Sequence, residues 1–449
     1  MIRQGFKKVG NFINILWVKS LSVYFGFVQG HAYLTNCEIN SIKALVANEE
    51  IGSEDIIAEF ETSFALLTGE GECVSFAAAR MAFYSLMKEL KIGVGDEVIM
   101  QAANCSVMAN AVLRLGATPV FADIDPETFG SSEAHIKNKI TERTKMIVAQ
   151  HSFGIPCKIK EISQLAKNHN IFLLEDCALS LGSAISGISV GNWGNAALFS
   201  TDHSKPINTY IGGFLYTKDS GLHERVKLFR NALPDLSVEH QKNLYKQFLF
   251  ERRYFRPNKY GLGCVISYFK VVFKKLNLFK WESPSLTDDY IVPNKSINAN
   301  YPYPAKLPPF LAKVGIYELE RWNKEKNARV ELFKKYLDIC IEYEYVQFLP
   351  KAYFDKSLQI VPLRFVFNHP NANHLRNKAR KYLDVDGFWF LKPIVACENP
   401  SDFGYVYGSC HVAEKFGKEV INFPCVLDHF YDSTLLRYLK STLRPSIEV

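Results

Sequence analysis

One lysine of this sequence lies in a polar turn between two apolar runs, where a buried amine could do covalent chemistry. Lys205 follows the apolar run 196–199, and Gly212 and Gly213 lead into a second apolar run at 214–217. Because short apolar runs predict buried strands, we expect Lys205 at the edge of a sheet. Burial lowers the pKa of a lysine and leaves a neutral amine that can form a Schiff base. A solvated surface lysine is the commoner case for a turn, so this pattern alone does not decide between the two.

Two carboxylates end a second predicted strand upstream of this turn. The apolar run 171–174 is followed by Glu175 and Asp176, and in an open α/β sheet ligands bind beyond the carboxyl ends of the strands. An acid there can hold the proton on the ring nitrogen of pyridoxal phosphate. A helix cap or a solvated turn would place the same residue type there, but an aspartate and then a lysine at successive strand ends favour the cofactor site. We expect the Asp176 side chain to lie outside the packed core.

Further short motifs accompany these two residues in a fixed order. They are residues 95–99, 116–125, 144–147, His151 with Gly154 and Pro156, 175–178, 191–194, 199–200 and 212–213. In this order they resemble the DegT/StrS family of nucleotide-sugar aminotransferases, which use pyridoxal 5′-phosphate. The resemblance is strong from about residue 35 to residue 217 and looser from about residue 304 to residue 443. It implies an α/β protein of fold type I, with a large domain around a mostly parallel, seven-stranded sheet and a smaller C-terminal α/β domain.

The resemblance also implies roles and substrates. Lys205 would hold the cofactor as a Schiff base, Asp176 would pair with its ring nitrogen, and Ser200 would be a further cofactor contact. The amino donor, glutamate by resemblance, and a nucleotide-linked keto-sugar would react in amino-sugar or surface-polysaccharide biosynthesis. A lysine at this position, where related dehydratases carry histidine, favours transamination. Because active sites of the family lie at a subunit interface, a homodimer is expected.

The expected phosphate cradle is the small-residue turn 74–80, which opens a helix. Ala78, Ala79 and Arg80 stand where Ser-Gly-Thr or Ser-Gly-Arg is common in the family. Backbone N–H groups at a helix N-terminus bind phosphate without a side chain, so the cradle survives the loss of a hydroxyl at Ala78. Arg80 could add a charge-assisted contact. An ordinary helix start with a solvated Arg80 is the alternative.

Two other positions depart from the family pattern. Cys105 stands where an aromatic side chain usually stacks on the pyridine ring, and Leu179 stands where glutamine or histidine is frequent. These changes remove packing and hydrogen bonds around the cofactor but leave the covalent chemistry possible. A catalytically impaired paralogue, which binds or regulates without turnover, therefore remains the alternative.

Composition sets the broad class of the protein. The chain has 449 residues, 48% hydrophobic residues and a formal net charge of +7, which is ordinary for a soluble globular protein. Its ten cysteines include no C-x-x-C pair, so we expect neither a disulfide framework nor a metal site, and reduced cytoplasmic thiols are the simplest interpretation.

The order of predicted elements divides the chain. We expect an N-terminal extension at 1–34, a large cofactor-binding domain at 35–240, a basic insert or linker at 241–299 and a small domain at 300–449. Helices are expected within 38–67 and near 79–90, 106–115, 132–140, 159–168, 312–322 and 433–443, and strands near 97–100, 119–122, 145–150, 171–175, 196–200, 214–217, 361–367 and 420–424.

Two segments outside the resemblance could touch a membrane surface. Residues 12–28 are rich in aromatic and aliphatic side chains, but Lys19 interrupts them, so they predict neither a signal peptide nor a spanning helix. Residues 241–280 carry ten basic residues against the single acid Glu251, and apolar residues at helical spacing between 262 and 276. For both segments we favour packing on the protein, with peripheral contact at the inner membrane surface as the alternative. No recognition motif for nucleic acid accompanies the charge.

Overall fold

The computed structural model of the chain describes residues 22–28, 30–46, 53–275, 284–287, 300–385, 389–425 and 431–444. The predictions for residues 1–21 and 276–280 lie outside the described residues.

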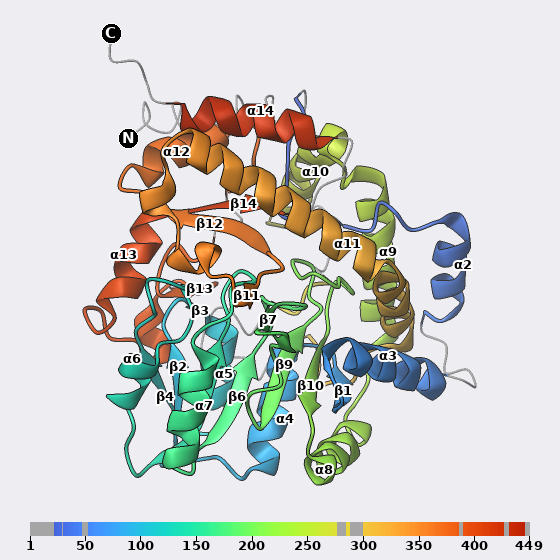
Figure 1. The fold of residues 1–449 in the computed structure, drawn as a ribbon. Helices are drawn as coiled ribbons and strands as arrows, with labels where there is room; N and C mark the ends of the chain where they lie inside the picture. Colours follow the sequence, from blue (N-terminus) through green and yellow to red (C-terminus); the bar gives the residue numbers. More distant parts are fainter. Residues whose placement is uncertain are drawn as a thin grey trace.

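A seven-stranded sheet forms the centre of the large domain (Figure 1), as predicted. The strand order is β1-β10-β9-β6-β5-β2-β4, and β10 alone runs antiparallel to its neighbours. The sequence-based prediction missed β1 and placed the others within one residue at each end. The strands are β1 (Glu72–Phe76), β2 (Glu97–Gln101), β4 (Thr118–Ala122), β5 (Thr144–Gln150), β6 (Phe172–Asp176), β9 (Ala196–Ser200) and β10 (Gly213–Thr217).

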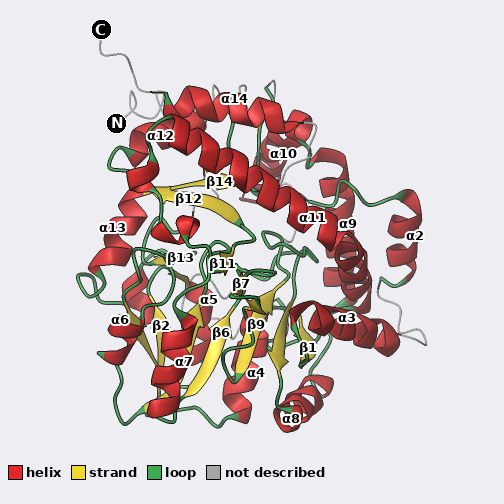
Figure 2. Ribbon diagram, in the orientation of Figure 1, coloured by secondary structure: helices red, strands yellow, loops and turns green. Residues whose placement is uncertain are grey.

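Helices cover both faces of this sheet (Figure 2), because successive side chains of a strand point to opposite faces. In β5, Met146 and Val148 join one hydrophobic core, while Ile147 and Ala149 join a second core on the other face. A sheet buried on both sides explains why its strands read as continuous apolar runs. The helices of the large domain are α4 (Ala79–Glu89), α5 (Ser106–Leu113), α6 (Glu133–Lys137), α7 (Ile159–Asn168) and α8 (Ser220–Asn231), of which α6 ends three residues before the predicted position.

The small domain packs on the large one through a long helix, α11 (Pro309–Glu342), which contacts α3 and α14 (Figure 1). The strand predicted from residue 361 begins only at Arg364. The other helices and strands here are η3 (Val346–Phe348), η4 (Lys351–Phe354), β11 (Leu358–Gln359), β12 (Arg364–Asn368), α12 (Ala372–Ala379), β13 (Ile394–Val395), η6 (Pro400–Phe403), α13 (His411–Glu419), β14 (Val420–Pro424) and α14 (Asp432–Leu443). Three short strands of the large domain also pair outside its sheet or with this domain: β3 (Asn104–Cys105), β7 (Ala184–Ile185) and β8 (Ile188–Ser189).

The described end of the N-terminal extension packs on the protein. Phe25 forms a bridge with Leu383 of the small domain, and the N–H of Tyr24 donates to the carbonyl of Pro257 at 2.9 Å. Beyond the extension, Thr35 caps the next helix through a reciprocal pair of hydrogen bonds with Glu38. The two helices that follow are α2 (Asn36–Ala44) and α3 (Ser53–Thr68).

The basic insert forms two helices, α9 (Val238–Tyr254) and α10 (Pro257–Lys275). The prediction that the apolar face of the second helix packs on the protein is wrong for much of its length. Leu262, Phe269 and Phe273 are 42%, 45% and 43% exposed. None of the described helices is long and apolar enough to cross a membrane.

A substitution at Gly315 tests how closely α11 packs against α3. A Cβ at Gly315 would lie 2.2 Å from Cζ of Phe60, which is fully buried. We expect Gly315→Ala to destabilise the fold by about 1–3 kcal/mol, because neither helix can move without disturbing the core. Urea unfolding measures this loss, with Asn323→Ala on the exposed side of the same helix as control. Equal midpoints for the two variants would contradict the close packing.

Candidate active site

The two residues singled out from the sequence lie at the same edge of the sheet. Strand β6 pairs with β9 in parallel, with Asp176 opposite Leu198, and Asp176 is the last residue of β6. Lys205 lies in the turn between β9 and β10, which is closed where the N–H of Thr201 donates to the carbonyl of Gly212 at 3.0 Å. Parallel strands end at one edge, so the turn lies beside the acid.

Lys205 is half-buried, and its amine lies among charged groups. Burial lowers the pKa of this amine, and the positive charge of Arg364 acts in the same direction. The carboxylates of Asp202 and Asp176 oppose the shift. The net lowering increases the share of neutral amine, the form that is nucleophilic and basic.

Asp176 lies inside the core, so the expectation that its side chain stays outside is wrong. It is 4% exposed, and its Oδ1 accepts a hydrogen bond from the N–H of Ala178 at 3.0 Å. Burial raises the pKa of this carboxyl, while the charges of Lys205 and His151 act to lower it. Removing the carboxylate would therefore also disturb the turn that follows β6.

The neighbouring carboxylate, Glu175, belongs to a structural cluster on the opposite side of the strand. It accepts hydrogen bonds from the N–H groups of Trp193 at 2.6 Å and Gly194 at 2.8 Å, which organises the loop before β9. His151 and Cys177 lie close enough to Glu175 to suggest a metal site. Nε2 of His151 lies 3.2 Å from Oε2 of Glu175, and Nδ1 of His151 accepts a hydrogen bond from the N–H of Cys157 at 3.0 Å, so both ring nitrogens have partners within the described fold.

The predicted phosphate cradle is a close approach of β10 to the start of α4. Ala78 is the N-cap of α4, has an extended backbone and offers no side-chain cap. It bridges Gly212, whose φ is +139°. A Cβ at Gly213 would lie 2.5 Å from the backbone N of Ala79, so only glycine allows this approach. The first-turn N–H groups of the helix are thereby brought to the sheet edge that carries Lys205.

Arg80, in the first turn of α4, is not solvated. Its side chain is 5% exposed, and Nη2 donates to the carbonyl of Leu286 in the segment 284–287. Its positive charge acts on Asp202 and Cys105, so it lies near the Lys205 turn. The alternative of an ordinary helix start with a solvated arginine is therefore wrong.

Cys105 and Ser200 also lie at this edge of the sheet. Cys105 is the N-cap of α5, and burial raises the pKa of its thiol against the nearby charge of Lys205. Its strand β3 pairs in parallel with β13 of the small domain. Ser200 ends β9, and its hydroxyl accepts a hydrogen bond from the N–H of Asp202 at 3.3 Å. Leu179 is buried, as expected of an apolar replacement.

Three residues at this edge were missed from the sequence. The Nζ of Lys205 lies 4.6 Å from the ring centroid of Trp389, and the guanidinium carbon of Arg364 lies 5.2 Å from the same centroid. No sequence signal marks either residue, because both belong to the small domain, where the resemblance is loose. Asp202 could have been found, since it is a carboxylate in the same turn as Lys205. Burial acts to raise the pKa of the Asp202 carboxyl, but the positive charges of His203 and Lys205 outweigh it and the pKa is lowered.

A buried network outside the strands holds the Lys205 turn. His31 of the N-terminal extension binds the carboxylate of Glu251 in α9 through Nδ1, and its Nε2 lies 2.9 Å from the carbonyl of Asn208. The N–H of Asn208 donates to Oε2 of Glu318 in α11 at 3.0 Å. The extension and α11 thus contact Asn208 directly, and α9 holds the His31 ring that makes one of these contacts. Because the network uses both backbone groups of Asn208, it restricts the path of the chain just after Lys205.

Comparison with known proteins confirms the resemblance. Residues 33–247 match the DegT/DnrJ/EryC1/StrS aminotransferase family. GDP-perosamine synthase from Escherichia coli O157:H7 is 37% identical over 174 residues, which are 39% of this chain and 48% of that protein. UDP-N-acetyl-3-dehydro-alpha-D-glucosamine 3-aminotransferase from Acidithiobacillus ferrooxidans is 37% identical over 172 residues, or 38% and 47% of the two chains. The chain thus spans about half the length of these relatives.

The likeness in fold extends beyond the segment that matches the family. A putative sugar aminotransferase from Streptococcus pneumoniae, solved in its PMP form, superposes with a TM-score of 0.67 and 18% identity, and covers 91% of this chain and 97% of its own. At this identity the likeness shows the fold alone. The predicted fold, an α/β protein of fold type I with a mostly parallel sheet, is confirmed.

The variant Glu318→Gln tests the network that holds the turn, through the pH dependence of the free energy of unfolding. Burial raises the pKa of this carboxyl to about 7, although His31 and the N–H of Asn208 act to lower it. Since the pKa is higher in the folded than in the unfolded state, the wild type loses stability, relative to Glu318→Gln, as the pH rises from about 5 to 8. Urea unfolding at several pH values measures the difference. Glu320→Gln, an exposed position on the same helix, is the control, and parallel pH profiles for wild type and Glu318→Gln would contradict the prediction.

Proposed function

We propose that this chain, whose residues 33–247 match the DegT/DnrJ/EryC1/StrS aminotransferase family, is a pyridoxal-phosphate-dependent aminotransferase that acts on a nucleotide-linked keto-sugar. One observation carries the proposal. The Lys205 amine and the Asp176 carboxylate, from neighbouring strand ends, lie close enough for each to shift the pKa of the other.

The residues at the sheet edge fit pyridoxal 5′-phosphate in three respects. Lys205 offers an amine of lowered pKa, Asp176 offers a buried carboxylate, and the glycine-dependent approach of β10 brings the first turn of α4 to the same edge. When bound, the cofactor supplies a ring that takes up the electron pair left when a proton leaves the carbon next to an amine. Ala78, Ala79 and Ser200 would line its phosphate side without a side-chain hydroxyl at residue 78.

The proposed roles follow from the charges. Lys205 would hold the cofactor covalently, and its free amine would serve as the base that takes up and returns a proton next to the reacting amine. Its lowered pKa suits this base, because a neutral amine accepts the proton. Burial raises the pKa of Asp176, and a protonated ring nitrogen next to it would favour the ionised carboxylate, which in turn would keep that proton in place. Arg80 adds positive charge on the phosphate side.

Trp389 compensates for the missing aromatic at residue 105. The segment that contains β13 docks on Cys105 and also brings Trp389 over the Lys205 amine. The indole lies with its ring face over the amine and covers it on that side. Loss of the aromatic at residue 105 therefore does not leave the lysine open to solvent on that side.

The relatives suggest the substrate class. Their names describe a GDP-linked and a UDP-linked amino sugar, which supports a nucleotide keto-sugar as acceptor and amino-sugar or surface-polysaccharide biosynthesis as the setting. Glutamate as donor and a homodimer rest on the family resemblance. Light scattering of the purified protein checks the dimer.

An impaired paralogue, which binds the cofactor without turnover, is the competing function. It is favoured by the absence of a side-chain cap at Ala78.

A peripheral membrane contact is a second candidate property, favoured by α10. Tyr268 and Val271 are 39% and 43% exposed, and like Phe269 they lie among basic residues of the insert. Apolar side chains can enter the lipid headgroup region while lysines bind anionic lipids. The protein would then act at a membrane surface, where lipid-linked glycans are assembled.

Lys205→Ala tests the proposed chemistry. We expect the variant to lose the visible absorbance of bound cofactor and its covalent trapping by borohydride, whereas Lys218→Ala, at an exposed position after β10, retains both. Covalent trapping at another lysine in Lys205→Ala would overturn the assignment.

The variant Asp176→Asn tests the partner of the ring nitrogen. It should keep the covalent trapping but slow amine-dependent conversion of the cofactor by roughly 10²-fold or more, because the amide cannot balance a protonated ring nitrogen.

Flotation with vesicles tests the membrane contact. We expect the wild type to bind vesicles that contain anionic lipid at low salt, and the variant Lys270→Glu/Lys274→Glu/Lys275→Glu to lose binding, since each basic residue near the surface contributes about 1 kcal/mol. The control carries the same charge change at exposed Lys145, Lys160 and Lys167. A wild-type protein that stays unbound at low salt excludes the contact.

A further inference from the structure

The described end of the N-terminal extension, residues 22–28 and 30–34, packs against both the small domain and the Lys205 turn, and we call it the strap. Phe27 and Gly30 of the strap line the same small cavity as Lys205. That cavity has a volume of about 10 Å³, which is at the lower limit for a single water molecule. The strap therefore packs closely on the turn that carries the lysine, although most of it precedes the segment that matches the family.

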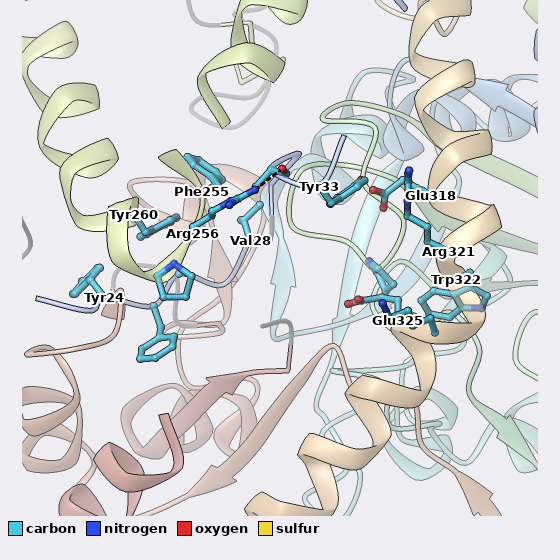
Figure 3. Close-up of a pocket in the computed structure, with 16 residues that line it drawn as sticks. Tyr24, Val28, Tyr33, Phe255, Arg256, Tyr260, Glu318, Arg321, Trp322 and Glu325 are labelled. Atoms are coloured by element: carbon cyan, nitrogen blue, oxygen red, sulfur yellow. Dashed lines mark hydrogen bonds between the residues drawn. The ribbon is translucent and has the colours of Figure 1, made fainter. Parts of the chain in front are cut away.

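Contacts on both sides of Phe27 fix the path of the strap. Before it, Tyr24 stacks on Tyr260 of α10 with ring centroids 6.2 Å apart (Figure 3). A Cβ at Gly26 would lie 2.3 Å from Cζ of Tyr260, so the strap lies directly on α10. After it, His31 is held by its buried contacts with α9 and with the turn. Phe27 is thus buried in a segment that has little room to shift.

Phe27 contacts a buried cation of the small domain. The guanidinium carbon of Arg364 in β12 lies 4.3 Å from the ring centroid of Phe27 and 5.2 Å from the ring centroid of Trp389. Arg364 is only 4% exposed, and a cation removed from water is attracted to the faces of aromatic rings. A guanidinium is planar and keeps its charge near neutral pH, so it suits contact with two rings. Phe27 therefore helps to hold a positive charge beside the indole.

A buried amide joins this cation to Trp389. Oδ1 of Asn422 in β14 accepts a hydrogen bond from Nη1 of Arg364 at 3.3 Å, and its Nδ2 donates to the carbonyl of Trp389 at 2.7 Å. The indole ring centroid lies 4.6 Å from Nζ of Lys205. The contacts thus form a continuous connection from Phe27 through Arg364 and Trp389 to the lysine amine.

The charge of Arg364 acts on that amine. Burial lowers the pKa of Lys205, and the positive charge of Arg364 acts in the same direction, because a second cation nearby disfavours the protonated amine. The carboxylates of Asp202 and Asp176 and the thiol of Cys105 oppose the shift. A guanidinium that moved away, or that gained water in place of a ring, would contribute less to the lowering. The share of neutral amine therefore depends on where Arg364 is held.

We propose that Phe27 is a positioning residue for Lys205, which acts by holding the Arg364 guanidinium against Trp389 beside the lysine amine. The part of that amine in catalysis rests on the proposed function, whereas its connection to the strap does not. The N-terminal extension then belongs to the active site of this chain. The competing interpretation is that the strap only adds packing, in which case equal losses of its buried side chains have equal effects on the lysine.

Amine labelling as a function of pH tests the proposal on the full chain without cofactor. Acetic anhydride reacts with neutral amines, and peptide mass spectrometry gives the extent of reaction at Lys205. The midpoint of the profile reports the protonation of the amine, while the plateau reports access of the reagent. We expect Phe27→Leu, which removes the ring but stays apolar, to move the midpoint to higher pH. Labelling near pH 7, relative to the plateau, should fall about threefold or more.

The matched control is Phe25→Leu, the same change at another buried position of the strap. The Phe25 ring lies edge-on to Tyr438 with centroids 6.5 Å apart, so this variant should keep the wild-type midpoint. Arg364→Gln should move the midpoint as Phe27→Leu does. Phe27→Leu should add no further shift in the Arg364→Gln background, because the ring acts through the guanidinium.

Four results would each overturn the proposal. They are an unchanged midpoint in Phe27→Leu, an equal shift in Phe25→Leu, a further shift when Phe27→Leu is added to Arg364→Gln, and an unchanged midpoint in Arg364→Gln alone. The last holds whatever the stability of the strap variants. The measurement needs neither pyridoxal phosphate nor turnover, so failure of Lys205 to trap the cofactor would leave its result unaffected.

Discussion

Parallel pairing of β6 with β9 is the constraint on which the whole site depends. Because the two strands run in one direction with Asp176 opposite Leu198, the chain leaves both at the same edge. The pleat of β6 then separates two adjacent acids. Glu175 enters the loop before β9 and organises it, while Asp176 faces the Lys205 turn.

The charges at this edge depend on one another. In a partly water-free environment each unpaired charge is costly, while opposite charges attract more strongly than in water. Lys205 lies among Asp176, Asp202 and Arg364, and burial outweighs the two acids in setting its pKa. The position of one side chain therefore affects the protonation of the others. Trp389 matters here because it covers the amine from the small domain.

Segments outside the matched region hold this arrangement in place. The extension contributes His31 and α11 contributes Glu318, which both contact the turn after Lys205, and α9 contributes Glu251, which holds the His31 ring. A buried ion pair such as that of His31 with Glu251 adds little net stability, since desolvation offsets the attraction, but breaking it is costly. Its consequence is geometric, because a single path of the turn satisfies all the partners.

The sequence by itself determined the sheet and the two residues at its edge. Apolar runs that are buried on both faces are local signals, so all strands of the sheet except β1 could be placed, and the ordered motifs identified Lys205 and Asp176 before any contact was known. Only the tertiary structure decided which side chains surround them. Trp389 approaches Lys205 because β13 pairs with β3, Arg80 is buried because Leu286 accepts its hydrogen bond, and α10 exposes apolar side chains that its spacing suggested would be packed. These contacts join residues far apart in the chain, and no short-range pattern encodes which distant surface will meet a given side chain.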